Sequence, residues 1–246
     1  MVTLALAGSV TACDFEQPNP GCIVQDASFA LWWAKYDPVT PPTDAQGNAC
    51  SESLGYGDQL GVWKFADPVS NTAKLVVRPL NIAGLGAADA NNTFDSLQVT
   101  GDLSTTTDAE DFCTASNFNS ANVNPVVEGE TSAVSYTLNN VRVYSSPSSP
   151  GTQLTGEVTY SVNGCTSTYV VRAVWPETPC DPTVDQNDPD LGVANCGAGS
   201  GINPDFATQC EEVTDPDDLY GYFGDPEDPS YREGRCVPSK AIPSFK

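Results

Sequence analysis

Cysteine is the residue of this 246-residue chain best suited to chemistry, and the chain has nine of them. Cysteine thiolates serve as nucleophiles or metal ligands, and paired cysteines form disulfides. No two cysteines have the C-x-x-C spacing of a zinc or redox site. With Cys13 set aside, an even number remains, which in an exported chain predicts up to four disulfides. These cysteines are Cys22, Cys50, Cys113, Cys165, Cys180, Cys196, Cys210 and Cys236.

The chain contains no histidine. This excludes Ser-His-Asp and Cys-His catalysis, zinc or copper held by imidazole, and haem ligated by histidine. A catalytic site in this chain would have to rely on carboxylates, such as Glu128 with Glu130 or Asp108 with Asp111. Glycoside hydrolysis needs two such acids roughly 5 to 9 Å apart. With 32 acidic residues, such pairs arise by chance, so they are no evidence of a catalytic site. We therefore expect no enzymatic activity, and we keep a carboxylate-dependent hydrolase as the second alternative function.

One acidic segment has oxygen ligands at the alternate spacing of a calcium loop. Its candidate ligands are Asp181, Asp185, Asn187 and Asp190. An EF-hand loop would also require a turn glycine and a terminal glutamate, and Pro189 occupies a ligand-type position instead. The group of Asp215, Asp217 and Asp218 is no stronger. We therefore expect solvated acidic loops and no cofactor, with calcium the one ion considered.

The overall charge limits the partners of the chain. The formal net charge is -22 at pH 7, and such a chain is repelled by a phosphate backbone and by anionic lipid. No apolar stretch approaches the 18 residues that a transmembrane helix needs. We therefore expect no nucleic-acid partner; a protein or small-molecule ligand stays unspecified.

An antiparallel β domain of about seven to nine strands is predicted over residues 22–175, as a sandwich or a barrel. Residues 28–36 have apolar side chains on both faces, which places Trp32 and Trp33 on opposite sides. Further strands are expected at residues 59–66, 73–82, 94–101, 132–145, 153–162 and 165–175, with a small-residue loop at 84–92. Asn163-Gly164 supplies both positive-φ positions of a type I′ turn and predicts a hairpin.

Two disulfide pairings are expected in this domain. Cys22 and Cys50 flank a strand and a turn-rich loop, so we expect them to bond to each other. Cys165 directly follows the hairpin turn, and Cys113 is its expected partner.

The last segment, residues 176–246, differs in composition from the domain before it. It holds ten of the twenty prolines and four cysteines, with no hydrophobic periodicity. We expect an irregular acidic tail held by disulfides, each contributing about 3 kcal/mol for a loop of about 15 residues. Leu219, Tyr220, Tyr222 and Phe223 are its expected docking residues.

The N-terminus resembles a bacterial lipobox at Val10-Thr11-Ala12-Cys13. In that family the cysteine sulfur carries a diacylglycerol, the preceding residues are removed, and the new amine is acylated. The resemblance implies that residues 1–12 are a signal peptide remnant, that Cys13 is the lipid attachment site, and that residues 13–21 are a tether. The absence of basic residues before Cys13 suggests a start codon further upstream. The alternative is that these N-terminal residues form a buried strand with a free cysteine. Asp14 does not decide in which membrane leaflet the lipid would lie.

A second resemblance lies in the hairpin and the tail. Tyr160-Ser-Val-Asn-Gly-Cys165, Val174-Trp175-Pro176 and the run from Cys196-Gly-Ala-Gly-Ser-Gly201 to Gln209-Cys210 resemble uncharacterised lipoproteins of myxobacteria. This resemblance implies a location in the cell envelope and no particular activity.

The expected function is therefore that of a non-enzymatic lipoprotein of the cell envelope, anchored to the membrane by lipid, and acting as a structural or binding module. Gly61-Val62-Trp63 resembles the G-x-W of lipocalins, which makes a ligand-binding barrel the first alternative.

Overall fold

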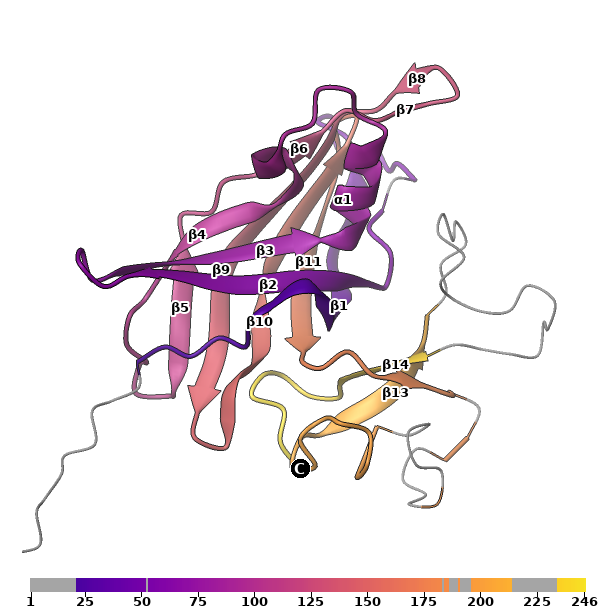
Figure 1. Cartoon of the computed structure of the whole chain (residues 1–246). Helices are drawn as coiled ribbons and strands as arrows, with labels where there is room; N and C mark the ends of the chain where they lie inside the picture. Colours follow the sequence, from indigo (N-terminus) through magenta and orange to yellow (C-terminus); the bar gives the residue numbers. More distant parts are fainter. Residues whose placement is uncertain (1–20, 52, 183, 186–189, 191–195, 214–233) are drawn as a thin grey trace, which may run out of the picture.

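The computed structural model describes residues 21–51, 53–182, 184, 185, 190, 196–213 and 234–246 (Figure 1). Within them lie a nine-stranded antiparallel sheet, a three-stranded sheet and a two-stranded hairpin, which confirms the all-β prediction. The main sheet contains β1 (Ala27–Thr43), β2 (Gly57–Asp67), β3 (Thr72–Pro79), β4 (Val99–Leu103), β5 (Phe112–Ser116), β6 (Ala121–Val123), β9 (Val134–Ser146), β10 (Ser149–Val162) and β11 (Cys165–Val174). The hairpin contains β7 (Val126–Val127) and β8 (Glu130–Thr131).

The main sheet closes on itself and forms a barrel. Its pairings run from β10 through β11, β1, β2, β3, β4, β5 and β9, and β9 then pairs with β10. The ninth strand, β6, pairs only with β9, beyond the stretch that pairs with β5. Figure 1 shows β2 and β3 crossing steeply over β9, β10 and β11, as the strongly tilted strands of a barrel do.

The β10–β11 hairpin forms as the sequence predicts. Asn163 and Gly164 have φ of 50° and 83°, and the flanking residues Val162 and Cys165 pair directly. Alternate side chains of both strands are buried inside the barrel, including Leu154, Val158, Tyr169 and Val171. The period of two in the sequence is thus the period of the barrel wall.

Large side chains fill the barrel interior. Trp32, Tyr36 and Tyr136 are at most 1% exposed, and they pack among leucines and valines of the other strands. Trp33 lies on the outer face of β1, so the two tryptophans point to opposite sides as predicted.

The segment between β3 and β4 differs from the expectation. The predicted loop at 84–92 and strand at 94–101 are replaced by helix α1 (Leu80–Ala87), a 3₁₀ turn η1 (Phe94–Leu97), and β4, which begins at Val99. Gly86 permits this packing, because a Cβ there would overlap the side chain of Leu97. No helix in the described part of the chain is long and apolar enough to cross a membrane.

The two disulfides of the barrel join other cysteines than expected. Cys22 bonds to Cys113 and Cys50 to Cys165, so the predicted Cys22–Cys50 and Cys113–Cys165 pairings are wrong. The reason is the barrel topology. Because β1 pairs with β11, Thr43 lies opposite Thr166, which brings the loop with Cys50 to the start of β11.

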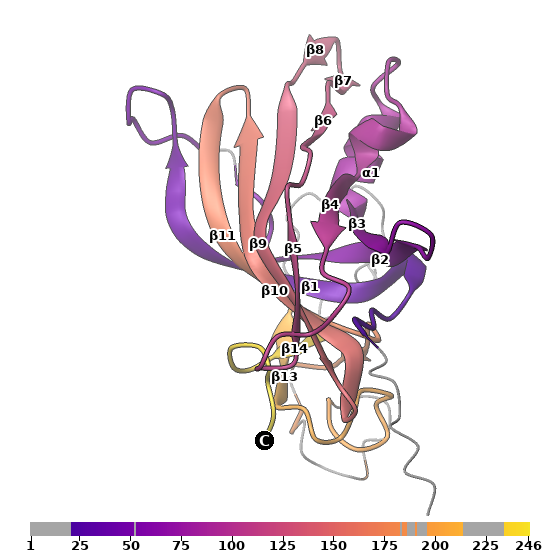
Figure 2. The same ribbon diagram turned by 90° about the vertical axis from the view of Figure 1, so that its left-hand side faces the viewer.

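The tail contains a small sheet that its composition does not reveal. Strand β14 (Gly234–Pro238) lies between β12 (Pro179–Cys180) and β13 (Thr208–Glu212). Disulfides Cys180–Cys210 and Cys196–Cys236 hold this sheet together. Figures 1 and 2 place it at the opposite end of the molecule from α1 and the β7–β8 hairpin.

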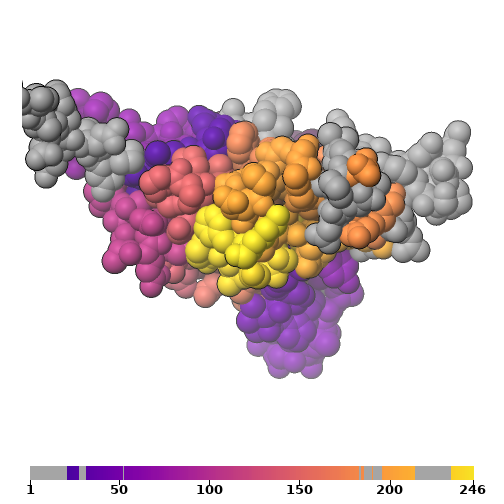
Figure 3. Space-filling view, turned by 90° about the horizontal axis from the view of Figure 1, so that it is seen from below, coloured from indigo at the N-terminus to yellow at the C-terminus, as the bar shows by residue number. Residues whose placement is uncertain are grey.

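The expected docking residues Leu219, Tyr220, Tyr222 and Phe223 lie outside the described residues. The described part of the tail packs through Phe206 and Phe245, whose rings are 5.4 Å apart, and Phe245 contacts Tyr144 of β9 at 5.7 Å. Figure 3 shows the C-terminal segment, in yellow, lying against the orange segment around residues 196–213.

A pair of glycine substitutions tests how closely residues 23–24 approach the start of β10 at Gly151. Gly151 has φ of 69°, and an added Cβ would overlap the carbonyl oxygen of Ile23. Gly164 has φ of 83° and nothing within 4 Å of an added Cβ. We expect Gly164→Ala to lower the free energy of unfolding by about 1 to 2 kcal/mol, the cost of left-handed backbone. Gly151→Ala should cost clearly more in urea denaturation. Equal losses would contradict the close approach of residues 23–24.

Candidate functional site

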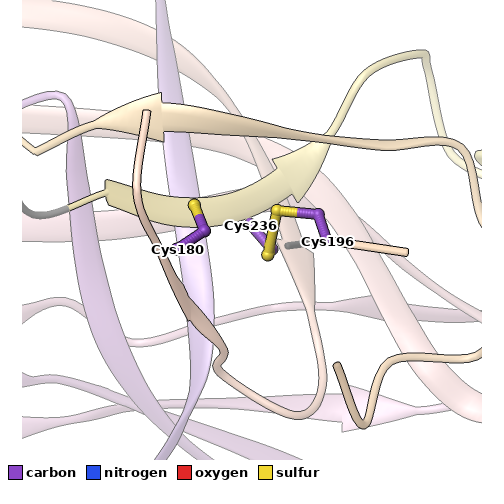
Figure 4. A group of neighbouring side chains, drawn as sticks. All are labelled: Cys180, Cys196 and Cys236. Atoms are coloured by element: carbon purple, nitrogen blue, oxygen red, sulfur yellow. A yellow bond between two sulfur atoms is a disulfide. The ribbon is translucent and has the colours of Figure 1, made fainter. Parts of the chain in front are cut away.

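Cys13, the predicted lipid attachment site, lies outside the described residues. The Sγ atoms of Cys180, Cys196 and Cys236 lie within 4.8 Å of one another. Figure 4 shows the Cys196–Cys236 disulfide with the sulfur of Cys180 beside it. Each of the three sulfurs is already bonded in a disulfide, so this group has no thiolate to offer a metal ion.

The calcium candidates are not gathered into a site by the described residues. Asp185 and Asp190 are exposed and Asp181 is half-buried. Among described side chains, these three carboxylates do not form a close group of ligand atoms. Asn187 lies outside the described residues, as do Asp215, Asp217 and Asp218.

The carboxylate pairs lie in turns. Asp108 accepts hydrogen bonds from the backbone N–H groups of Phe112 and Glu110, both at 2.9 Å. These bonds, with Arg142 at 3.2 Å, hold the pKa of Asp108 below its usual range. Asp111 is exposed, and so are Glu128 and Glu130 in the β7–β8 hairpin. A general acid needs a raised pKa, and the turn around Asp108 produces the opposite effect.

A different carboxylate is buried inside the barrel. Asp58 of β2 is 7% exposed and lies 3.3 Å from the backbone N–H of Asn81 in the first turn of α1. Burial raises its pKa to about 8. Because Pro79 precedes the helix and supplies no side-chain cap, Asp58 provides that acceptor from another strand.

The tyrosines beside Asp58 form a second polar group in the interior. The hydroxyls of Tyr36 and Tyr136 are 3.3 Å apart, and burial raises the pKa of both. Tyr169 accepts a hydrogen bond from the backbone N–H of Leu54 at 2.9 Å. These contacts fix the loop before β2 and the start of α1 against the core, which is a structural role.

The outer wall of β2 and β3 carries a patch of aromatic residues around one arginine, in which Trp63 is buried at 8% exposure and the two phenylalanines are exposed. We call it the Arg78 patch, and it consists of Trp63, Phe65, Arg78 and Phe94. The guanidinium carbon of Arg78 lies 4.2 Å from the ring centre of Phe94 and 5.5 Å from that of Trp63. Phe65 and Phe94 are 60% and 62% exposed.

Arg78 differs from the other arginines of the described chain in its partners. Arg142, Arg172 and Arg235 each form an ion pair with a carboxylate. Arg78 forms none with any described residue; its Nη2 donates to Gln98 at 2.9 Å, and its buried Nε has no acceptor there. Burial lowers the pKa of Arg78. The net charge of the chain is -22, yet Arg78 has no carboxylate partner among the described residues.

Sequence reasoning missed the Arg78 patch. It singled out Trp63 as part of a lipocalin-like G-x-W, but Trp63 lies on the outer wall beside Arg78. Arg78 and Phe94 are 16 positions apart, and only the unpredicted η1 turn brings them together. The one available sign was an arginine in an apolar strand, Leu75-Val-Val-Arg78.

The tail is attached to the barrel by charged contacts. Arg235 of β14 and Glu177 form an ion pair of 2.8 Å, with side chains 7% and 11% exposed. Arg235 also lies over the ring of Trp33, and Glu177 accepts from Gln59. Lys35 of β1 forms a further ion pair with Glu211 of β13. Arg172 of β11, which is paired with Asp37 of β1, donates hydrogen bonds to the backbone carbonyls of Pro238 and Lys240 in the tail. These paired charges hold the tail sheet against the outer face of β1 and β11.

Comparisons with known proteins find sequences that are similar to this chain. A family model described as MlpA matches residues 30–176. The chain is similar to a protein of Myxococcus xanthus named "Putative lipoprotein MlpA", with 40% identity over 249 residues that cover 100% of this chain and 96% of that protein. A search of solved structures finds no match.

The buried Asp58 predicts an unusual dependence of stability on pH. Its folded pKa of about 8 lies above the ordinary value of 3.8, so the folded state keeps a proton that the unfolded state releases. Stability from the neutral carboxyl is therefore complete below about pH 4 and is lost as pH rises through 8. Between pH 5 and pH 8 we expect wild type to lose about 4 kcal/mol of unfolding free energy relative to Asp58→Asn, because the amide does not titrate.

The matched control is Asp102→Asn, at an exposed carboxylate paired with Lys74 whose pKa is lowered. Its unfolding free energy, measured by chemical denaturation, should change with pH as that of wild type does between pH 5 and pH 8. Parallel curves for wild type and Asp58→Asn would contradict a neutral Asp58.

Proposed function

The chain belongs to the MlpA family, and from this premise we propose that it is a non-enzymatic binding module, held at the surface of a cell-envelope membrane by lipid on Cys13. The observation that carries the proposal is the lipobox-like Val10-Thr11-Ala12-Cys13, in a chain similar over its whole length to a protein named as a lipoprotein. Two acyl signals at one terminus suffice for stable anchoring.

The barrel interior supports a binding module over the lipocalin-like alternative. A lipocalin binds its ligand inside the barrel. Here Trp32, Tyr36 and Tyr136 occupy the interior and are at most 1% exposed. A ligand would have to displace a packed aromatic core, so binding is better assigned to the outer wall.

The outer-wall surface that we assign to binding is the Arg78 patch. An arginine between two aromatic rings, in a patch with two exposed phenylalanines, has the composition typical of interface centres. The guanidinium has no described carboxylate partner, so the complementary group is a carboxylate on a partner protein of the envelope.

Metabolic labelling tests the anchor. With an alkyne-tagged fatty acid in a myxobacterial host, wild-type protein should carry label and partition into detergent. Cys13→Ala should lose the label, because no sulfur remains for the diacylglycerol. Asp14→Asn leaves the acylated residue unchanged and should keep the label. Label on Cys13→Ala, or none on wild type, would overturn the proposal.

Photo-crosslinking tests the binding surface independently. A photoreactive phenylalanine at position 94 in the full-length protein should give discrete crosslinked bands in envelope fractions. The same residue at position 69, where Val69 is 95% exposed in the β2–β3 turn, should not. Adding Arg78→Met should reduce the bands severalfold, because the partner's carboxylate loses its cation. Equal crosslinking at both positions would contradict the assignment.

A further inference from the structure

The two disulfides of the tail lie close enough to exchange partners. Cys180 is bonded to Cys210, and Cys196 to Cys236. Yet the sulfur of Cys180 lies within 4.8 Å of both sulfurs of the other disulfide. Cys210 and Cys236 are also directly opposite each other in the β13–β14 ladder, so their side chains lie on the same face.

The register therefore fits a second set of bonds. Directly opposed residues in an antiparallel pair have Cα atoms about 4.5 to 5.5 Å apart, within the range of a disulfide. A Cys210–Cys236 bond would leave Cys180 and Cys196, whose sulfurs are already neighbours, to form the other.

The same disulfides are open to a small reactant. A cavity of about 300 Å³ is lined by Cys196 and Cys210, one cysteine from each disulfide, and by the charged residues Asp185 and Lys246. Cys210 is half-buried, while Cys180, Cys196 and Cys236 are buried.

We propose that these two disulfides form a thiol–disulfide exchange site, at which a low-molecular-weight thiol converts one disulfide connectivity into the other. The entering thiolate attacks the sulfur of Cys210, forms a mixed disulfide with it, and releases the Cys180 thiolate. Cys180 attacks Cys196, forms the Cys180–Cys196 disulfide, and releases the Cys236 thiolate.

The last step returns the thiol. The Cys236 thiolate attacks Cys210 in the mixed disulfide, forms the Cys210–Cys236 bond, and expels the small thiolate. Over the three steps, three disulfide bonds break and three form. No net electrons are transferred, so the small thiol acts as a catalyst.

Disulfide mapping tests the exchange in the full-length oxidised protein. The protein is incubated without oxygen with substoichiometric glutathione, quenched with acid, alkylated and digested. Cleavage before aspartate separates the four tail cysteines, because Asp181, Asp205 and Asp215 lie between successive ones. Mass spectrometry should detect Cys180–Cys196 and Cys210–Cys236 disulfides. The amount of reduced glutathione should not fall, because the exchange regenerates it.

The barrel disulfide Cys22–Cys113 is the internal control. Cys22 and Cys113 are at most 1% exposed, so their link should exchange at least about tenfold more slowly than those of the tail, because attack requires access. Persistence of only the original tail links after prolonged incubation would overturn the proposal. So would scrambling of all four disulfides at one rate.

A variant tests the intramolecular step without added thiol. Cys180→Ser leaves Cys210 as a thiol opposite Cys236, so exchange should form Cys210–Cys236 and move the free thiol to Cys196. The matched variant Cys22→Ser leaves Cys113, which belongs to no such group of described sulfurs, and its thiol should stay on Cys113. Alkylation at neutral pH locates each thiol. Alkylation of Cys180→Ser on Cys210 alone would contradict the proposal.

Discussion

Closure of the sheet is the constraint on which the rest of this structure depends. An open sheet would leave β9 and β10 with unpaired backbone groups, and the β9–β10 pairing joins these two strands and closes the barrel, with the short β6 added beside β9. Closure also fixes which side chains lie inside, because neighbouring residues of a strand face opposite sides. Trp32 fills the interior for this reason, and Trp33 is left on the wall, where the tail covers it.

The tail depends on that wall in turn. Among the described residues, the buried cluster around its three short strands is small and includes Val174 of the barrel; its members are Val174, Cys180, Cys196, Ile202, Phe206 and Cys236. Two disulfides join the small sheet internally, and the buried Arg235–Glu177 pair contacts the barrel through Trp33 and Gln59. Burying such a pair carries a desolvation cost. The pair therefore specifies where the tail docks more than it stabilises the fold.

Local patterns predicted those elements of the fold whose causes are local. The Asn163-Gly164 turn and the alternation of β10 and β11 needed only neighbouring residues. Helix α1 was missed because its glycines have low helix propensity, and the reason for Gly86 is contact with Leu97, outside the helix. The disulfide partners and the Arg78 patch depend on which strands become neighbours in the closed barrel, and single-strand patterns do not contain that information.

The point where the chain enters the barrel bears on the proposed anchor. Eight residues separate Cys13 from Cys22, so even a fully extended tether holds the barrel within about 30 Å of the lipid. Cys22 is bonded to Cys113 of β5, and its N–H donates to Thr105 at 3.1 Å. Any pull on the tether would thus reach the barrel wall through a covalent bond, before it could strip β1 from its neighbours. A lipid-anchored module needs its strongest attachment at this entry point, and the Cys22–Cys113 disulfide provides it.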